Sequence, residues 1–254
     1  GKSCSTRAMP SLGNKFPTFH AFASAALPQI YAPNRLQSAQ RLSINELASG
    51  VLLNDGKGHL SFRPLPRLAQ VSASFGLAFS DFNADGNMDL AMAHNFYSPQ
   101  PETGNVDGGL GMVLRGLGDG TFQPLRVDQS GFLLPGDAKA LALTDLDGDT
   151  RPDLVATVNS SSPKIFLNRM VKGDSLIIRL KGPKGNPRGV GSRVSLKLKN
   201  GKTLVGEVYS GSSYLTASST DLFFSIPEGD EALSLVVRSP LGKIIEQKLT
   251  ASTG

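Results

Sequence analysis

The sequence of 254 residues carries 26 basic and 21 acidic residues, a net charge of +5, and 39% of its residues are hydrophobic. The apolar content is high enough for a folded core, which excludes a disordered chain, and the sequence lacks the run of about 20 apolar residues that a transmembrane helix needs. Short apolar stretches separated by Gly, Pro and Asp predict an all-β protein and exclude a helical bundle.

The positive charge belongs to the C-terminal third of the chain. Residues 171–254 hold 12 basic and 7 acidic residues, whereas the charges before residue 171 balance. The composition also changes within residues 168–174, so we predict two domains, residues 1–170 and residues 171–254. Because the chain begins at Gly1, we expect a processed protein or a piece of a longer one.

Two sequence motifs recur between residues 45 and 170, whereas residues 1–44 carry neither and are expected to form a degenerate strand or two. VLLNDGKGHL at 51–60 returns as VLRGLGDGTF at 113–122, and DFNADGNMDL at 81–90 returns as DLDGDTRPDL at 145–154. PKIFLN at 163–168 begins a third copy of the first motif. Four short strands per unit are typical of a propeller blade. Residues 1–170 are therefore predicted to form a partial β-propeller of about two blades and a fragment, with unpaired strand edges that promote self-association.

The second motif places side-chain oxygen atoms at positions 1, 3, 5 and 9 of a loop between two strands. Calcium takes about six to eight oxygen ligands, and a backbone carbonyl at position 7 would add one. An EF-hand is excluded because Met92 and Ala156 stand where it has Glu. The predicted calcium ligands are Asp81, Asn83, Asp85, Asn87 and Asp89 in the first loop and Asp145, Asp147, Asp149, Arg151 and Asp153 in the second.

The alternative is a pair of Asx turns that end strands without a metal ion. Carboxylates packed within nine residues repel one another, and this cost recurs at the same phase of both repeats, which favours calcium. Position 6 distinguishes the two loops. Gly86 accepts a positive φ at this position, whereas the β-branched Thr150 resists it.

Six apolar or alternating stretches between residues 175 and 250 predict a small β-sandwich or barrel. Lys197 and Lys199 fall on the outward phase of one stretch, and Asn200 and Gly201 predict a hairpin turn after it. A solvated strand face is the favoured interpretation of these charges. The alternative is a surface for an acidic polymer, formed with Lys181, Lys184, Arg188 and Arg193. Nucleic acid is disfavoured because no aromatic residues are interleaved with the charges.

The Gly turn followed by the D-x-[DN]-x-D-x-x-x-D loop resembles the FG-GAP/VCBS repeats of integrin-α-like β-propellers, over about residues 45–168. That resemblance implies calcium between the strands of a blade. NPRGVGSRVSL at 186–196 and VVRSPLGKI at 236–244 resemble the ASPIC and UnbV domain, a small β domain that follows such propellers in secreted bacterial proteins. This chain departs from the second pattern at Ser239, where the family usually has Trp, and at SIPEGDE, which replaces an FGLG turn.

These patterns predict a non-catalytic, calcium-binding interaction module that contacts protein or glycan and is secreted or lies in the cell envelope. The alternative is an enzyme or accessory subunit that processes a polysaccharide or secondary metabolite through its propeller loops. Two buried carboxylates outside the calcium loops would favour that alternative. His20, His59 and His94 lack the neighbours of a nucleophile, and the insertion at residues 95–111 is the best candidate for a partner-binding loop.

Overall fold

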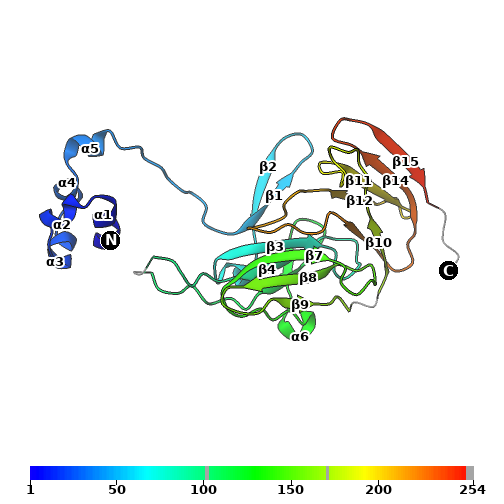
Figure 1. The fold of residues 1–254 in the computed structure, drawn as a ribbon, viewed down its shortest axis with the longest axis horizontal. Coiled ribbons are helices and arrows are strands. Elements are labelled where there is room, and N and C mark those ends of the chain that lie inside the picture. Colours follow the sequence, from blue (N-terminus) through cyan, green and yellow to red (C-terminus); the bar gives the residue numbers. More distant parts are fainter. Residues whose placement is uncertain (101–102, 170–171, 250–254) are drawn as a thin grey trace. The chain divides into compact units, whose positions relative to one another are not determined.

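The computed structural model describes residues 1–100, 103–169 and 172–249 (Figure 1). The predicted domain boundary at residues 170 and 171 lies outside the described residues. The chain divides into two compact units, one formed by residues 1–47 and 100–103 and the other by residues 48–99 and 104–254. The fold is mostly β, with 14% helix and 34% strand in several small antiparallel sheets.

The N-terminal unit is helical, so the expectation of strands in residues 1–44 is wrong, and the fold is mostly β rather than all-β. Local signals explain the helices: the Thr18 hydroxyl accepts the Ala21 N–H at the start of one, and Pro33 occupies the first turn of another. The helices are α1 (Lys2–Ala8), α2 (Ser11–Lys15), α3 (Phe19–Ala23), α4 (Leu27–Ile30) and α5 (Pro33–Gln37).

The second unit begins with the repeated motifs, and the strands lie where the repeats predict them. A hairpin β1-β2 is followed by a four-stranded sheet in the order β3-β4-β5-β6 and a three-stranded sheet in the order β7-β8-β9. The strands are β1 (Gly50–Asn54), β2 (Leu60–Pro64), β3 (Ser74–Ser80), β4 (Asp89–His94), β5 (Met112–Gly116), β6 (Phe122–Pro124), β7 (Ala138–Thr144), β8 (Asp153–Val158) and β9 (Lys164–Phe166). A 3₁₀ turn (Arg67–Gln70) and α6 (Val127–Ser130) lie in the connections.

The sheet β3-β4-β5-β6 has the strand content predicted for one blade. It packs against the sheet β7-β8-β9 (Figure 1), and small buried residues, among them Ala78, Ala91 and Ala156, form the core between them. The approach is closest at Gly76, where an added Cβ would lie 2.8 Å from the backbone nitrogen of Leu141. Within the described ranges no sheet closes into a ring, so the propeller stays a prediction.

All six strands predicted after residue 170 are present. They form a two-stranded sheet, β10-β13, and a four-stranded sheet in the order β12-β11-β14-β15, whose apolar side chains share one buried core. The Lys197 side chain points outward, and residues 199–202 form the predicted hairpin turn. The strands are β10 (Asp174–Ile178), β11 (Arg193–Leu198), β12 (Thr203–Glu207), β13 (Leu222–Ile226), β14 (Ala232–Arg238) and β15 (Ile244–Lys248).

The helices of this chain are short. Among the residues described, none of them has the length and apolar character needed to span a membrane.

Candidate functional site

The two Asp loops occupy equivalent places in neighbouring sheets. The first loop connects β3 to β4, and the second connects β7 to β8. In each loop, position 1 directly follows the first strand and position 9 begins the second strand. Each Asp loop is therefore the turn of a β-hairpin, at equivalent positions of the two repeats.

In the second loop, the carboxylates of Asp145, Asp147 and Asp149 converge, with one oxygen atom from each lying within 4.8 Å of the others. Two oxygens on opposite sides of a calcium ion are about 4.8 Å apart, because each lies about 2.4 Å from the ion. The spacing of this cluster therefore fits one calcium ion. Arg169 contacts Asp147 at 2.7 Å and Arg151 lies 3.9 Å from Asp149, so the cluster is partly neutralised by cations of the chain.

The aspartate at position 9, a predicted ligand, accepts backbone hydrogen bonds in both loops. Asp89 accepts the Phe82 N–H through one oxygen and the Gly116 N–H through the other, at 3.0 and 2.8 Å. Asp153 likewise accepts the N–H groups of Leu146 and Asn168, at 2.9 and 2.8 Å. Each position-9 carboxylate thus fixes its own loop and connects it to the end of β5 in the first sheet and to the residues just after β9 in the second.

The contacts of Gly116 and Asn168 with these carboxylates were not predicted from the sequence. Both occupy the same position of the first repeated motif, in VLRG and in IFLN. The alignment of the repeats could therefore have predicted that the residue at this position contacts the position-9 aspartate.

The first loop has hydrogen bonds of the same kind as the second, in which Asp145 accepts the N–H groups of Gly148 and Thr150. Asp81 accepts the N–H groups of Asp85 and Gly86, and the Asn83 amide donates to Asp85 at 3.0 Å. Lys202, a residue of the β11-β12 hairpin turn, donates to the Gly86 carbonyl and contacts the Asn87 side-chain oxygen at 3.3 Å. The ammonium group of Lys202 therefore already supplies positive charge beside this loop.

Burial changes the acidity of the first loop. Burial raises the pKa of Asp81 to about 6, although hydrogen bonds from the backbone of Gly86 and Asp85 oppose the rise. Burial also raises the pKa of Asp89 to about 6, against the opposing hydrogen bonds from Gly116 and Phe82. The charged forms of both carboxylates are therefore costly unless a cation compensates them.

The backbone confirms that position 6 needs a positive φ in both loops, with φ of 82° at Gly86 and 67° at Thr150. Position 4 also has a positive φ, 54° at Ala84 and 80° at Gly148. Each loop therefore has one glycine and one residue with a Cβ in the left-handed region, in opposite order. Thr150 is held there by a hydrogen bond between its hydroxyl and that of Ser175, at 2.5 Å. The sequence pattern indicated a positive φ at position 6 but not at position 4.

Several basic residues of the C-terminal segment already have partners. Lys199 contacts Glu231 at 3.2 Å and Arg193 lies 3.7 Å from Glu207, while Lys202 binds the first Asp loop. Lys181, Lys184 and Arg188 are exposed. These pairings support the interpretation of the charges as a solvated surface, and the alternative of an acidic polymer stays a hypothesis.

The histidines lie in separate settings. His94 is completely buried, and neither of its ring nitrogens has a hydrogen-bond partner among the described residues. Burial lowers its pKa, so the ring is neutral at physiological pH. His59 is exposed and pairs with Asp55.

The carboxylates outside the loops bear on the enzyme alternative. In the described part of the chain, Asp137 is the buried carboxylate outside the two loops, and it is paired with Lys139. The pair of buried carboxylates that would favour an enzyme is therefore not found among these residues.

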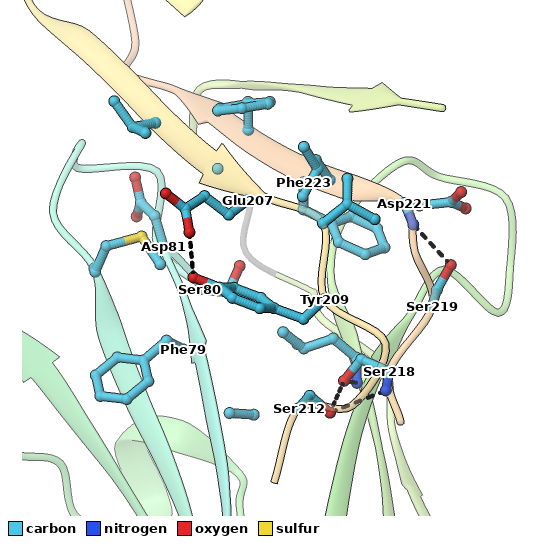
Figure 2. Close-up of a pocket in the computed structure, with 18 of the residues that line it drawn as sticks. Phe79, Ser80, Asp81, Glu207, Tyr209, Ser212, Ser218, Ser219, Asp221 and Phe223 are labelled. Carbon is cyan, nitrogen blue, oxygen red and sulfur yellow. Dashed lines mark hydrogen bonds between the residues drawn. The ribbon is translucent and has the colours of Figure 1, made fainter. Parts of the chain in front are cut away.

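A separate cleft of about 1090 Å³ lies between β3, β12, β13 and the connection at residues 208–221; we call it the β3 cleft (Figure 2). Its rim includes the exposed side chains of Phe79, Val205, Tyr209 and Tyr214. Sequence analysis did not predict this cleft, because it is assembled from segments more than 100 residues apart in the chain.

Comparison with known families gives one match, to the ASPIC and UnbV domain, over residues 182–252. The matched segment includes β11 to β15, and its last three residues lie outside the described ranges. A search of the curated proteins found no match. The ASPIC and UnbV resemblance predicted from the sequence is thus supported for the C-terminal segment, while the FG-GAP/VCBS resemblance of residues 45–168 stays a prediction.

Proposed function

We propose that this protein is a calcium-stabilised, non-catalytic interaction module. The observation that carries the proposal is the cluster of Asp145, Asp147 and Asp149, whose oxygen spacing matches a single calcium ion. An ion bound there would offset the repulsion among three carboxylates held within one short loop. It would also stabilise the folded state, since the unfolded chain lacks the assembled ligands.

The first loop is a second, weaker candidate. Its backbone has the same alternation of positive φ as the second loop, and its buried Asp81 needs a compensating cation. Among the described residues, three carboxylates converge in the second loop, whereas the first loop has Asn83 at position 3. We therefore expect the second loop to bind calcium more tightly than the first.

The test is thermal unfolding of the purified chain in calcium and in a chelator. Calcium should raise the melting temperature, and Asp145→Ala should remove most of the rise because it deletes a ligand of the tighter site. Asp81→Ala should remove a smaller part. Asp128→Ala is the matched control, since Asp128 is exposed and lies outside both loops. An unchanged wild-type melting curve in chelator would leave the loops as metal-free Asx turns.

The interaction role rests on the β3 cleft. We propose a protein or glycan at the outside of the cell as the partner, with the protein secreted or held in the cell envelope. The FG-GAP/VCBS resemblance supports that location. The insertion at residues 95–111 stays a candidate contact loop, and residues 101 and 102 within it lie outside the described structure.

A further inference from the structure

We propose that residues 105–110 form a cover over the side chain of His94, and that protonation of His94 releases this cover in acidic solution. We call residues 105–110 the cover segment. It belongs to the insertion at residues 95–111, the candidate contact loop. The inference goes beyond the proposed interaction role, because it concerns the response of this segment to pH, and its test needs neither a partner nor calcium.

His94 is the last residue of β4, and its side chain is buried in an apolar setting. The exposed fraction of His94 is 0%, and Leu90 and Met92, which share its face of the strand, belong to a buried apolar cluster. Neither ring nitrogen has a hydrogen-bond partner among the described residues. Ser74 pairs with His94 across the β3-β4 ladder, and the Ser74 hydroxyl is also buried without a partner in this part of the chain. A protonated ring carries a charge and two N–H donors, so its burial here costs far more than burial of the neutral ring.

The cover segment passes directly over His94 because two glycines allow a close approach. A Cβ added to Gly109 would lie 2.3 Å from the Cβ of His94, and one added to Gly108 would lie 2.9 Å from the carbonyl oxygen of Val71. Both distances are too short for a real Cβ contact, so the backbone leaves no room for a side chain at either position. The cover segment is therefore part of what keeps water from His94.

Paired hydrogen bonds hold the cover segment at two points. The Asn95 side chain donates to the Gly109 carbonyl at 2.7 Å and accepts the Gly109 N–H at 2.8 Å. Val106 and Phe96 exchange two backbone hydrogen bonds, at 2.8 and 2.9 Å. Asn95 directly follows His94, so one attachment of the cover segment lies beside the titratable ring. The β3-β4 and β4-β5 ladders do not include these bonds, so the cover segment can detach while the sheet stays intact.

The direction of the pH effect follows from the burial of the ring. Burial lowers the pKa of His94 while the cover is closed. An exposed histidine has a pKa of about 6.5, so the open state takes up a proton at a higher pH than the closed state does. As the pH falls below about 6.5, proton uptake therefore favours the open state, by up to about tenfold per pH unit. Above that pH the ring is neutral in both states, and the closed state is favoured.

The charged groups around His94 do not produce the same effect. The elements beside the ring carry Asp89 on β4, Arg115 on β5, Arg67 in the 3₁₀ turn, Asp107 in the cover segment, and Lys139, which donates to the Asn95 carbonyl. None of them bonds to the ring in the described structure. Burial raises the pKa of Asp89, and of Asp81 after β3, to about 6, so their protonation favours the folded state and acts in the opposite direction. Asp137, the partner of Lys139, has a lowered pKa and titrates at more acidic pH.

The experiment measures hydrogen exchange of the full chain by NMR between about pH 5 and about pH 8, in chelator, with the intrinsic pH dependence of amide exchange subtracted. The probes are the amides of Phe96, Val106 and Gly109, which donate the hydrogen bonds that hold the cover segment. We expect their protection to fall by up to about tenfold per pH unit below about pH 6.5. The amides in the middle of β4 should stay protected, which distinguishes local release from global unfolding.

Three variants separate His94 from other titrating groups. His94→Leu places an apolar side chain in the same site and should keep the cover segment protected throughout the pH range. His59→Leu is the matched control, since His59 is exposed and pairs with Asp55, and its pH dependence should be that of the wild type. Gly109→Ala forces the cover segment away from His94 and should release it at neutral pH. The His94 ring should then titrate with a pKa of about 6.5, followed by its NMR signals, and this result does not depend on the folding of His94→Leu.

Three results would overturn the proposal. They are constant protection of the probe amides across the pH range in the wild type, the wild-type pH dependence in His94→Leu, and unchanged protection of Val106 in Gly109→Ala. Because the samples contain neither calcium nor a partner, the proposed function stands or fails separately.

Discussion

A glycine with a positive φ contributes to stability by adopting a backbone conformation that residues with a Cβ resist. Gly148 has φ of 80°, and a Cβ added there would meet nothing within 4 Å, so the lack of a side chain at this position serves the left-handed backbone and not the packing. Thr150, two residues later, already has a Cβ in the left-handed region. The loop thus has one strained residue, and a second one would add to the cost.

Gly148→Ala is therefore expected to destabilise the protein by about 1 kcal/mol, through the left-handed backbone alone. The measurement is urea unfolding in chelator and in calcium, with the calcium affinity also reduced in the variant. Gly185→Ala is the control, because the space around Gly185 is equally open and its φ is not positive. Equal losses in the two variants would show that the backbone of the second loop differs from the one described.

At the scale of elements, the strands were predictable because their signals are local. Alternating apolar residues and Asp or Gly turns located β1 to β15 within a few residues. The helices of residues 1–44 were missed because each has only 4 to 7 residues, too few for a helical period to emerge. Thr18 and Pro33 were readable start signals.

The Asp loops and the β3 cleft differ in how far apart in the chain their residues lie. The candidate ligands followed from spacing within one loop, whereas the contacts of Lys202 with Gly86 and of Ser213 with β3 join residues far apart in the chain. Only tertiary structure brings such groups together. The β3 cleft could not be predicted from the sequence because its residues come together only in the tertiary structure.

A buried ion pair connects the start of β7 to its surroundings. The Asp137 carboxylate lies 2.5 Å from the Lys139 ammonium and accepts N–H groups of Asn159 and Tyr97 at 2.9 and 3.2 Å. The ammonium also lies 3.7 Å from the centre of the Phe75 ring. Burial alone would raise the pKa of Asp137, but hydrogen bonds from Lys139, Asn159 and Tyr97 outweigh it and hold this pKa below its usual value.

Because the folded-state pKa of Asp137 is lowered, its contribution to stability is present above about pH 4 and is lost as the pH falls through the folded pKa. Asp137→Asn should cost about 3 kcal/mol at neutral pH, since the charge of Lys139 stays buried without its partner. The stability of the Asp137→Asn variant should also fall less than that of the wild type as the pH is lowered. Both are measured by urea unfolding across pH.

Asp128→Asn provides the control for this pair. Asp128 and Arg126 form an ion pair whose side chains are 64% and 75% exposed, so its loss should change stability little. If the free energy of unfolding depends on pH in the same way in Asp137→Asn and in the wild type, the pKa of Asp137 does not differ between the folded and unfolded states.

At the scale of the whole molecule, the sheets differ in how their edges and faces are covered. Residues 212–219 cover parts of the edges of β3 and β7. The hairpin β1-β2 has no third strand among those described, and one of its faces exposes Leu52, Leu60 and Phe62. Its other face packs Val51 against a buried cluster that includes Leu114. An apolar face beside a bare strand edge is a site where protein chains associate.

We therefore expect this chain to self-associate as its concentration rises, through the hairpin β1-β2. Leu52→Lys combined with Leu60→Lys should shift the sedimentation profile toward monomer, because charges on an exposed strand face oppose edge-to-edge pairing. Leu241→Lys is the matched control, since Leu241 is 95% exposed in the turn between β14 and β15, away from the hairpin. A wild-type monomer at every concentration and salt level, with the amides of β1 protected from hydrogen exchange, would mean that the hairpin edge is covered in solution. Association that persists unchanged in the double variant would place the contact elsewhere on the molecule.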